Sequence, residues 1–195
     1  VIKMRETPLF LGVDLKFFSH HSKERLSSIV FVGGLIKRKR VEELLRLAEH
    51  FSNLQFHIIG EGPDGEKLKQ TASRNVVFHG VLNHKEMDAI FSSSDLLFLP
   101  SKSEGFPKVI LEAASAGIPS VVYDSYGVSE WMDNKKNGFV VSAFKQVEEL
   151  IHELLENPTL LQQVSNNAQE LAHRFDWKHI INDWEKVIVN LYNGK

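Results

Sequence analysis

The chain contains no cysteine among its 195 residues. This absence excludes a disulfide framework and thiol chemistry, and it is compatible with a reducing compartment such as the cytosol. No apolar run approaches the ~20 residues that cross a bilayer. The first residues, VIKMRETPLFLGVDLKFF, also lack the continuous apolar segment of a signal peptide. We therefore expect a cytoplasmic protein that does not span a membrane.

An excess of positive charge is also missing. The formal net charge of -2 gives no field of the kind that attracts nucleic acid, so we predict no nucleic-acid partner. The sequence has no H-E-x-x-H, no D-x-D and no G-x-S-x-G motif, so it predicts no metal site and no hydrolase nucleophile. His57 and His79 fall within strand-like runs, where a structural role is the simpler interpretation.

The composition that remains is that of a globular protein. Hydrophobic residues make up 43% and charged residues 25% of the chain, and the length suits one well-buried core. The chain begins at Val1 without an initiator Met, and we expect it to be a piece of a longer protein.

Apolar strand-like runs alternate with helical periodicity from residue 28 onward, which predicts a parallel sheet with crossover helices. The predicted strands cover residues 29–35, 55–60, 76–82, 96–100, 120–124 and 138–142, and the helices between them cover 41–51, 65–73, 85–94 and 108–116. Three more helices are predicted over 147–156, 160–175 and 177–192. The predicted fold class is therefore α/β, with a doubly wound, parallel, six-stranded Rossmann-like sheet and C-terminal helices.

The stretch PSKSEGFPKVILEAASAGIP, residues 100–119, leads from the fourth predicted strand through a polar loop into a helix. Pro107 suits the first helical turn, because its missing N–H needs no partner there and its φ is already helical. The amides of residues 105–109 would then point out of the helix N-terminus, past the carboxyl end of the sheet. Such a group of amides binds anions.

Two carboxylates flank this anion site. Glu104 lies in the loop, and Glu112 lies about one and a half turns into the helix. A carboxylate accepts hydrogen bonds from a vicinal diol but cannot donate to a phosphate, so it suits sugar hydroxyls. An anion at the amides and a polyol at the glutamates together describe a nucleotide sugar. The alternative is that both glutamates are ordinary solvated charges.

The same stretch resembles the E-x7-E signature of the retaining, GT-B-fold glycosyltransferases of family 4, the kind to which glycogen synthase and sucrose synthase belong. The matching positions are Glu104, Gly105, Glu112, Ala113, Gly117 and Pro119. The resemblance implies that this chain is one half of a GT-B glycosyltransferase, an enzyme of the EC 2.4 class. It also implies a UDP- or GDP-sugar donor and no metal or other cofactor.

The resemblance also implies roles for individual residues. Glu104 and Lys39 would be catalytic: Glu104 would position the transferred sugar, and Lys39 would stabilise the departing diphosphate. Glu112 would hold the ribose diol. The implied donor-binding residues are Gly33, Gly34, Val81, Leu82, Glu104, Gly105, Phe106, Pro107, Lys108, Val109 and Glu112, with Arg38 and Glu130 as further candidates.

A basic cluster, residues 37–40, precedes the helix predicted to open at Val41. Cations at a helix N-terminus oppose the macrodipole, which suggests a bound anion, although a solvated charge run is the alternative. The family pattern here is G-R-L-x-x-x-K-G. Gly33, Leu35 and Lys39 match this pattern, but Gly34 replaces the arginine. Loss of one charge-assisted hydrogen bond, roughly 1.5 to 3 kcal/mol, would weaken donor binding on the order of ten- to a hundredfold unless a neighbouring cation compensates.

GEGPDG, residues 60–65, spells G-x-G-x-x-G between a strand and a helix, which is the dinucleotide-binding pattern. Pro63 removes one amide from the supposed phosphate loop, the next strand does not end in an acidic residue, and the unit is second in the chain. In the glycosyltransferase family the same position is a G-x-G-P turn near the donor. An NAD(P)-binding oxidoreductase domain therefore stays as an alternative.

The predicted organisation has three parts. Residues 1–27 form a linker and the start of the domain, residues 28–175 form the nucleotide-sugar-binding domain, and residues 176–195 form a helix that would cross back to an N-terminal acceptor domain.

The predicted partners are the donor, that acceptor domain and, for the full enzyme, the cytoplasmic face of a membrane. Polysaccharide or glycolipid assembly would be a usual setting. Because Gly34 replaces the arginine, a non-catalytic relative that serves as an interaction module is a second alternative.

Overall fold

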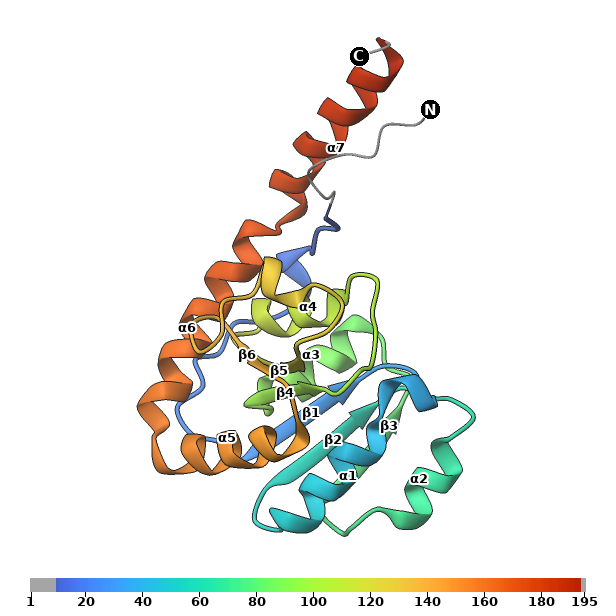
Figure 1. The fold of residues 1–195 in the computed structure, drawn as a ribbon, viewed down its shortest axis with the longest axis vertical. Coiled ribbons are helices and arrows are strands. Elements are labelled where there is room, and N and C mark those ends of the chain that lie inside the picture. Colours follow the sequence, from blue (N-terminus) through green and yellow to red (C-terminus); the bar gives the residue numbers. More distant parts are fainter. Residues whose placement is uncertain (1–9, 194–195) are drawn as a thin grey trace.

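The computed structural model describes residues 10–193, which fold around one six-stranded sheet (Figure 1). All strand pairs are parallel, in the order β3-β2-β1-β4-β5-β6. The strands are β1 (Ser28–Val32), β2 (Gln55–Ile59), β3 (Val76–Gly80), β4 (Leu96–Leu99), β5 (Ser120–Tyr123) and β6 (Phe139–Val141). The predicted fold class is confirmed.

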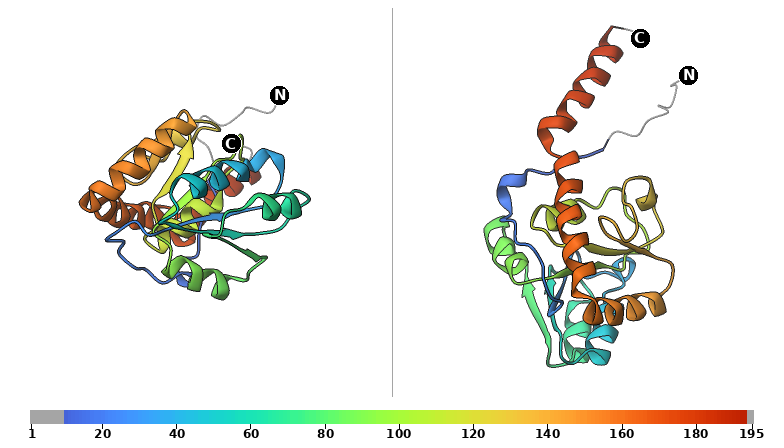
Figure 2. Two further views of the ribbon diagram at one scale, coloured as in Figure 1. Left: turned by 90° about the horizontal axis from the view of Figure 1, so that it is seen from below. Right: turned by 90° about the vertical axis from the view of Figure 1, so that its left-hand side faces the viewer.

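The central strands are apolar because helices cover both of their faces. All residues of β4 and β5 are buried, as expected for parallel strands inside an α/β fold. Figure 2 shows α1 and α2 on one side of the sheet and α3 on the other. The helices are α1 (Val41–His50), α2 (Gly65–Thr71), α3 (His84–Ser92), α4 (Lys108–Ser115), α5 (Phe144–Glu156), α6 (Pro158–Arg174) and α7 (Trp177–Tyr192).

The helix predictions are confirmed with small shifts at the ends. Pro107, expected in the first turn of α4, is instead the residue before it, and its carbonyl accepts the Ile110 amide at 3.0 Å. Its ψ of 88° is not helical, so the helix begins at Lys108. Helix α5 begins at Phe144, one turn earlier than predicted. Pro158 is the first residue of α6, as its lack of an N–H favours.

Helix α4 ends where the fold requires glycine. Gly117 has a φ of +78°, the left-handed conformation that commonly follows a helix. A Cβ there would also lie 2.7 Å from the His21 carbonyl oxygen. The Ser165 hydroxyl of α6 donates to the Gly117 carbonyl at 2.6 Å, which ties α6 to the end of α4. The backbone conformation and the close packing thus explain why position 117 of the E-x7-E stretch is a glycine.

Helix α7 projects away from the sheet, with its far end beyond the rest of the domain (Figures 1 and 2). At its start the Trp177 amide donates to the Val13 carbonyl at 3.2 Å, and at its middle the Trp184 indole N–H donates to the Phe10 carbonyl at 2.9 Å. Gly12 fits because a Cβ there would lie 2.6 Å from the Trp177 ring. Parts of the predicted linker (1–9) and of the predicted crossing helix (194–195) lie outside the described residues.

Candidate functional site

The strand order places the candidate site between β1 and β4. The order of the strands along the sheet reverses there, which is the position at which open α/β sheets bind ligands. The β1 loop contains a short 3-10 turn, Lys37–Lys39. The β4 loop runs from Pro100 to Pro107, and the Lys102 amide donates to the Arg38 carbonyl at 2.9 Å. The two loops that carry the predicted residues are therefore in direct contact.

Glu104 is the residue at which the two loops meet. Its Oε1 lies 2.5 Å from the Lys39 Nζ and its Oε2 lies 3.2 Å from the Arg38 Nη1. The Arg38 guanidinium also donates to the Ser103 carbonyl. Burial alone would raise the pKa of the Glu104 carboxyl, but its hydrogen bonds, led by that from Lys39, and the Lys39 charge hold that pKa below its ordinary value. Glu104 is therefore ionised at neutral pH.

The N-terminus of α4 supplies backbone donors beside this ion pair. The amides of Gly105, Phe106, Lys108 and Val109 find no acceptor within residues 10–193. A Cβ on Gly105 would meet nothing within 4 Å, so the backbone there is open to a ligand. The positive end of the helix dipole adds to the effect of the free amides and of Lys39. The structure thus brings together the predicted anion-binding groups.

Glu112 lies farther along α4, and its electrostatic state is opposite to that of Glu104. Burial raises the pKa of its carboxyl, and the charge of nearby Lys108 only partly offsets this. Its carboxylate accepts no hydrogen bond from the described side chains or amides. A half-buried carboxylate that accepts no hydrogen bond from the protein suits a donor from outside, such as a diol.

The remaining predicted residues near the start of α4, Phe106, Pro107 and Lys108, differ in how far their side chains are buried. Phe106 packs in an aromatic cluster, with its ring centroid 5.5 Å from that of Phe10 and 5.4 Å from that of Trp131. Pro107 is buried and Lys108 is exposed. Phe106 therefore offers a ligand its backbone amide, while its side chain stabilises the fold.

Gly33 and Gly34 follow β1 as predicted. A Cβ on Gly33 would lie 3.6 Å from the Lys39 Cε, so the lysine side chain passes close to this glycine. A Cβ on Gly34 would meet only the Glu61 carbonyl oxygen, at 3.8 Å, which is an ordinary contact. A side chain could therefore start at position 34 without a clash at its Cβ, although the sequence does not supply the arginine of the family pattern.

The glycines of GEGPDG have a packing role. A Cβ on Gly60 would lie 2.0 Å from the Gly33 carbonyl oxygen, and one on Gly62 would lie 2.4 Å from the Leu35 carbonyl oxygen. The Gly60 amide already donates to the Gly80 carbonyl at 2.7 Å, and the Gly65 amide to the Gly62 carbonyl at 3.0 Å. The Gly60 and Gly65 amides are therefore not free for a phosphate, whereas the Glu61 and Gly62 amides find no acceptor within residues 10–193. The NAD(P)-binding alternative stays a prediction.

Two predicted regions lie at the margins of the site. Val81 is 70% exposed just after β3, and Leu82 packs partly against the core. A cavity of about 450 Å³ reaches Gly80, the residue before Val81, between β3 and α2. Glu130 is exposed in a 3-10 turn, Val128–Glu130, and its carboxylate approaches Gly127 rather than Glu104. The roles of Val81, Leu82 and Glu130 stay predictions.

Arg40 is a special position that the sequence analysis did not recognise. It stands where the family pattern ends in glycine, and its φ of +49° is the left-handed conformation that glycine adopts freely. Its guanidinium lies 5.5 Å from the centre of the Tyr123 ring and 3.5 Å from Glu43. Arg40 is therefore engaged with Tyr123 and Glu43, whereas Arg38 contacts Glu104.

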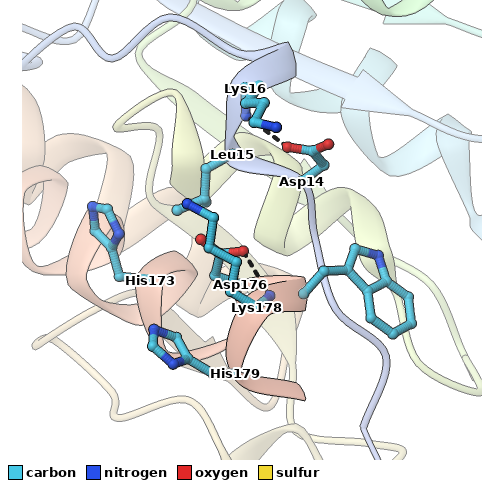
Figure 3. Close-up of a pocket in the computed structure, with 8 residues that line it drawn as sticks. Asp14, Leu15, Lys16, His173, Asp176, Lys178 and His179 are labelled. Atoms are coloured by element: carbon cyan, nitrogen blue, oxygen red, sulfur yellow. Dashed lines mark hydrogen bonds between the residues drawn. The ribbon is translucent and has the colours of Figure 1, made fainter. Parts of the chain in front are cut away.

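A separate cavity of about 650 Å³ lies where the segment around Asp14 meets the junction of α6 and α7 (Figure 3). The Asp14 and Asp176 carboxylates accept the amides of Lys16 and Lys178, both at 3.0 Å, and so cap the turns that follow them. The cavity is lined by Asp14, Leu15, Lys16, His173, Asp176, Trp177, Lys178 and His179, and by none of the predicted site residues. Residues 10–193 contain no group of three or more potential metal ligands.

The family model described as glycosyl transferases group 1 matches residues 13–171. The chain belongs to this family. An uncharacterised glycosyltransferase of Haemophilus influenzae is 28% identical to this group 1 chain over 172 residues, which make up 83% of the chain and 48% of that protein.

Solved structures give the same fold. Sucrose-phosphate synthase from Thermosynechococcus elongatus has a TM-score of 0.84 at 19% identity, covering 96% of this chain and 53% of that one. HepE of Anabaena, solved in complex with UDP-glucose, has a TM-score of 0.81 at 20% identity. The match covers 92% of this chain and 56% of the HepE chain. The group 1 chain thus spans about half the length of these proteins. Membership of family 4 and retention of configuration stay predictions.

Proposed function

We propose that this chain is the donor-binding half of a glycosyltransferase that moves a sugar from a UDP- or GDP-sugar to a glycan, lipid or other acceptor with retention. The observation that supports this most is the contact between Lys39 and Glu104 beside the free amides at the start of α4. Cation and amides suit a diphosphate, and the two glutamates suit hydroxyls. The similarity of the fold to HepE, solved with UDP-glucose, agrees with this donor class.

The ion pair also suggests how binding prepares the site. A bound diphosphate attracts Lys39 and draws it away from Glu104, so the carboxylate gains capacity to accept hydrogen bonds from the transferred sugar. As the bond to the sugar breaks, negative charge develops on the diphosphate, where Lys39 and the amides are already placed to stabilise it. Glu112 holds the ribose. This scheme uses no metal.

The acceptor and the remaining catalytic groups come from an N-terminal domain in the full enzyme. Exposed apolar side chains on the outer part of α7, including Ile188, Leu191 and Tyr192, support a partner domain there. The isolated chain therefore binds donor weakly and transfers nothing. No helix among residues 10–193 is both long and apolar enough to cross a membrane. We place the full enzyme in the cytoplasm, with the option of peripheral attachment to the inner face of a membrane.

A calorimetric titration of the chain with UDP, GDP, ADP and NAD tests this function. We expect one nucleoside diphosphate to bind and Glu112→Ala to weaken it about ten- to a hundredfold, because a charged hydrogen bond is lost. Glu156→Ala, at an exposed helix end, is the matched control and should bind like the parent chain. Binding of NAD alone, or the same affinity for both variants, contradicts the proposal.

A non-catalytic relative is the second candidate, because Gly34 replaces the arginine of the family pattern. The same titration separates the two functions. A chain that serves only as an interaction module binds none of the four nucleotides.

A further inference from the structure

The cavity between the segment around Asp14 and the junction of α6 and α7 has a well-bonded frame (Figure 3). The Val13 amide donates to the Phe175 carbonyl at 2.9 Å, and the Trp177 amide donates to the Val13 carbonyl at 3.2 Å. Val13 is buried, so these bonds are shielded from water. One wall of the cavity is a 3-10 turn, Leu15–Phe17, and the other is the first turn of α7. The bonds of Val13 fix the two walls relative to each other without a ligand.

The basic side chains on these walls are unpaired within residues 10–193. Lys16 belongs to the 3-10 turn and Lys178 to α7, and neither ammonium makes a hydrogen bond or an ion pair there. The rings of His173 and His179, which also line the cavity, make none either. Lys186, about two turns farther along α7, instead pairs with an aspartate at 3.1 Å. The cavity therefore gathers hydrogen-bond donors that a ligand can use.

The two aspartates of the cavity balance the two lysines in formal charge but do not pair with them. Asp14 and Asp176 each accept an amide of the following turn at 3.0 Å, and the described part of the chain places no lysine within ion-pair distance of either. The first turn of α7 has no acidic residue and carries Lys178 and His179. Cations at this end of a helix oppose its macrodipole, and a bound anion would offset that effect. An anion therefore suits the cavity better than a metal ion, for which residues 10–193 offer no group of three ligands.

We propose that this cavity is a second anion site, which binds a phosphate monoester group between Lys16 and Lys178. The inference does not rest on the proposed function, because none of the donor-site residues lines the cavity. A phosphate monoester has a charge of about -1.5 to -2 at neutral pH, so it matches two ammonium groups better than a carboxylate does. A volume of about 650 Å³ is more than one phosphate needs. It leaves room for the organic part of the ligand beside Leu15 and Trp177, which also line the cavity.

An NMR titration of the ¹⁵N-labelled chain with glucose 6-phosphate tests the inference, with glucose as the uncharged control. We expect the largest amide shifts at residues 15–16 and 177–179, and no comparable shifts with glucose. Lys16→Gln and Lys178→Gln should each bind glucose 6-phosphate about tenfold more weakly, because one charge-assisted hydrogen bond is lost. Lys186→Gln, on the same helix but outside this cavity, is the matched control and should bind like the parent chain.

Two further arms separate the sources of the phosphate and the two sites. Sedimentation with phosphatidylcholine vesicles, with and without phosphatidic acid, offers the same group on a lipid, and binding that depends on Lys178 in this arm alone assigns the site to a lipid headgroup. Lys39→Gln changes the donor site and should bind glucose 6-phosphate like the parent chain.

The inference is overturned if neither glucose 6-phosphate nor the phosphatidic acid vesicles bind. It is also overturned if binding is lost in Lys39→Gln and kept in Lys178→Gln, or if all the variants bind alike. The proposed function stands in each of these cases, because the titrations with UDP and GDP test it separately.

Discussion

At the scale of single residues, the two glutamates of the site have pKa values shifted in opposite directions. Burial would raise that of Glu104, but its hydrogen bonds, led by that from Lys39, and the Lys39 charge together lower it, whereas burial raises that of Glu112. Glu104 thus contributes stability that is present above its unfolded pKa and is lost as the pH falls through its lower folded pKa. Glu112 contributes stability that is present below its unfolded pKa and is lost as the pH rises through its higher folded pKa.

Glu112→Gln should therefore stabilise the free chain at pH 7, by about 1 kcal/mol, because it keeps the shape of the side chain and removes a half-buried charge. At pH 4 the carboxyl is largely protonated in the parent, so the gain should disappear. Urea unfolding of both proteins at the two pH values measures the difference. An equal difference at pH 4 and pH 7 would show that the effect does not come from the charge.

Gly34→Arg should restore the cation that the family pattern has at this position. Gly34 does not adopt a positive φ, and a Cβ there makes only an ordinary contact, so neither the backbone nor the Cβ opposes the substitution. We expect the affinity for the nucleoside diphosphate to rise about tenfold, as for one added charge-assisted hydrogen bond. Gly34→Gln controls for size without charge. If both variants bind alike in a calorimetric titration, position 34 does not face the phosphates.

At the scale of elements, the sequence predicts much of the fold because most elements follow simple rules. Strands β4 and β5 are apolar since both faces are buried, and Pro158 begins α6 since it lacks an N–H. The backbone conformations of Arg40 and Tyr126 could not be predicted from their residue types, because both have the positive φ that glycine adopts most readily. The distance between Lys39 and Glu104 depends on strand order, which no local pattern encodes. The sequence therefore does not predict which distant loops contact each other or where non-glycine residues adopt a left-handed conformation, and the structure shows both.

The two ends of α7 should differ in their effect on stability. Trp184 packs partly against the core and donates to the Phe10 carbonyl, whereas Ile188 is 59% exposed. Trp184→Ala should lower the free energy of unfolding by roughly 1 to 3 kcal/mol, and Ile188→Ala should change it by less than about 0.5 kcal/mol. Urea unfolding compares the two. A large loss for Ile188→Ala would mean that the outer part of α7 packs on this domain.

At the scale of the whole molecule, the fold gathers groups from distant parts of the chain at one edge of the sheet. The Lys39 ammonium from the β1 loop, the Glu104 carboxylate from the β4 loop and the amides of α4 meet where the strand order reverses. The central claim is that this group of residues binds a nucleoside diphosphate.

An NMR titration of the ¹⁵N-labelled chain with UDP, and in parallel with GDP, tests that claim most directly. We expect the largest amide shifts at the α4 N-terminus, at Gly105, Phe106, Lys108 and Val109, with smaller shifts at Lys39. Largest shifts at residues 60–65, or saturating binding that leaves the α4 amides unchanged, would contradict the account.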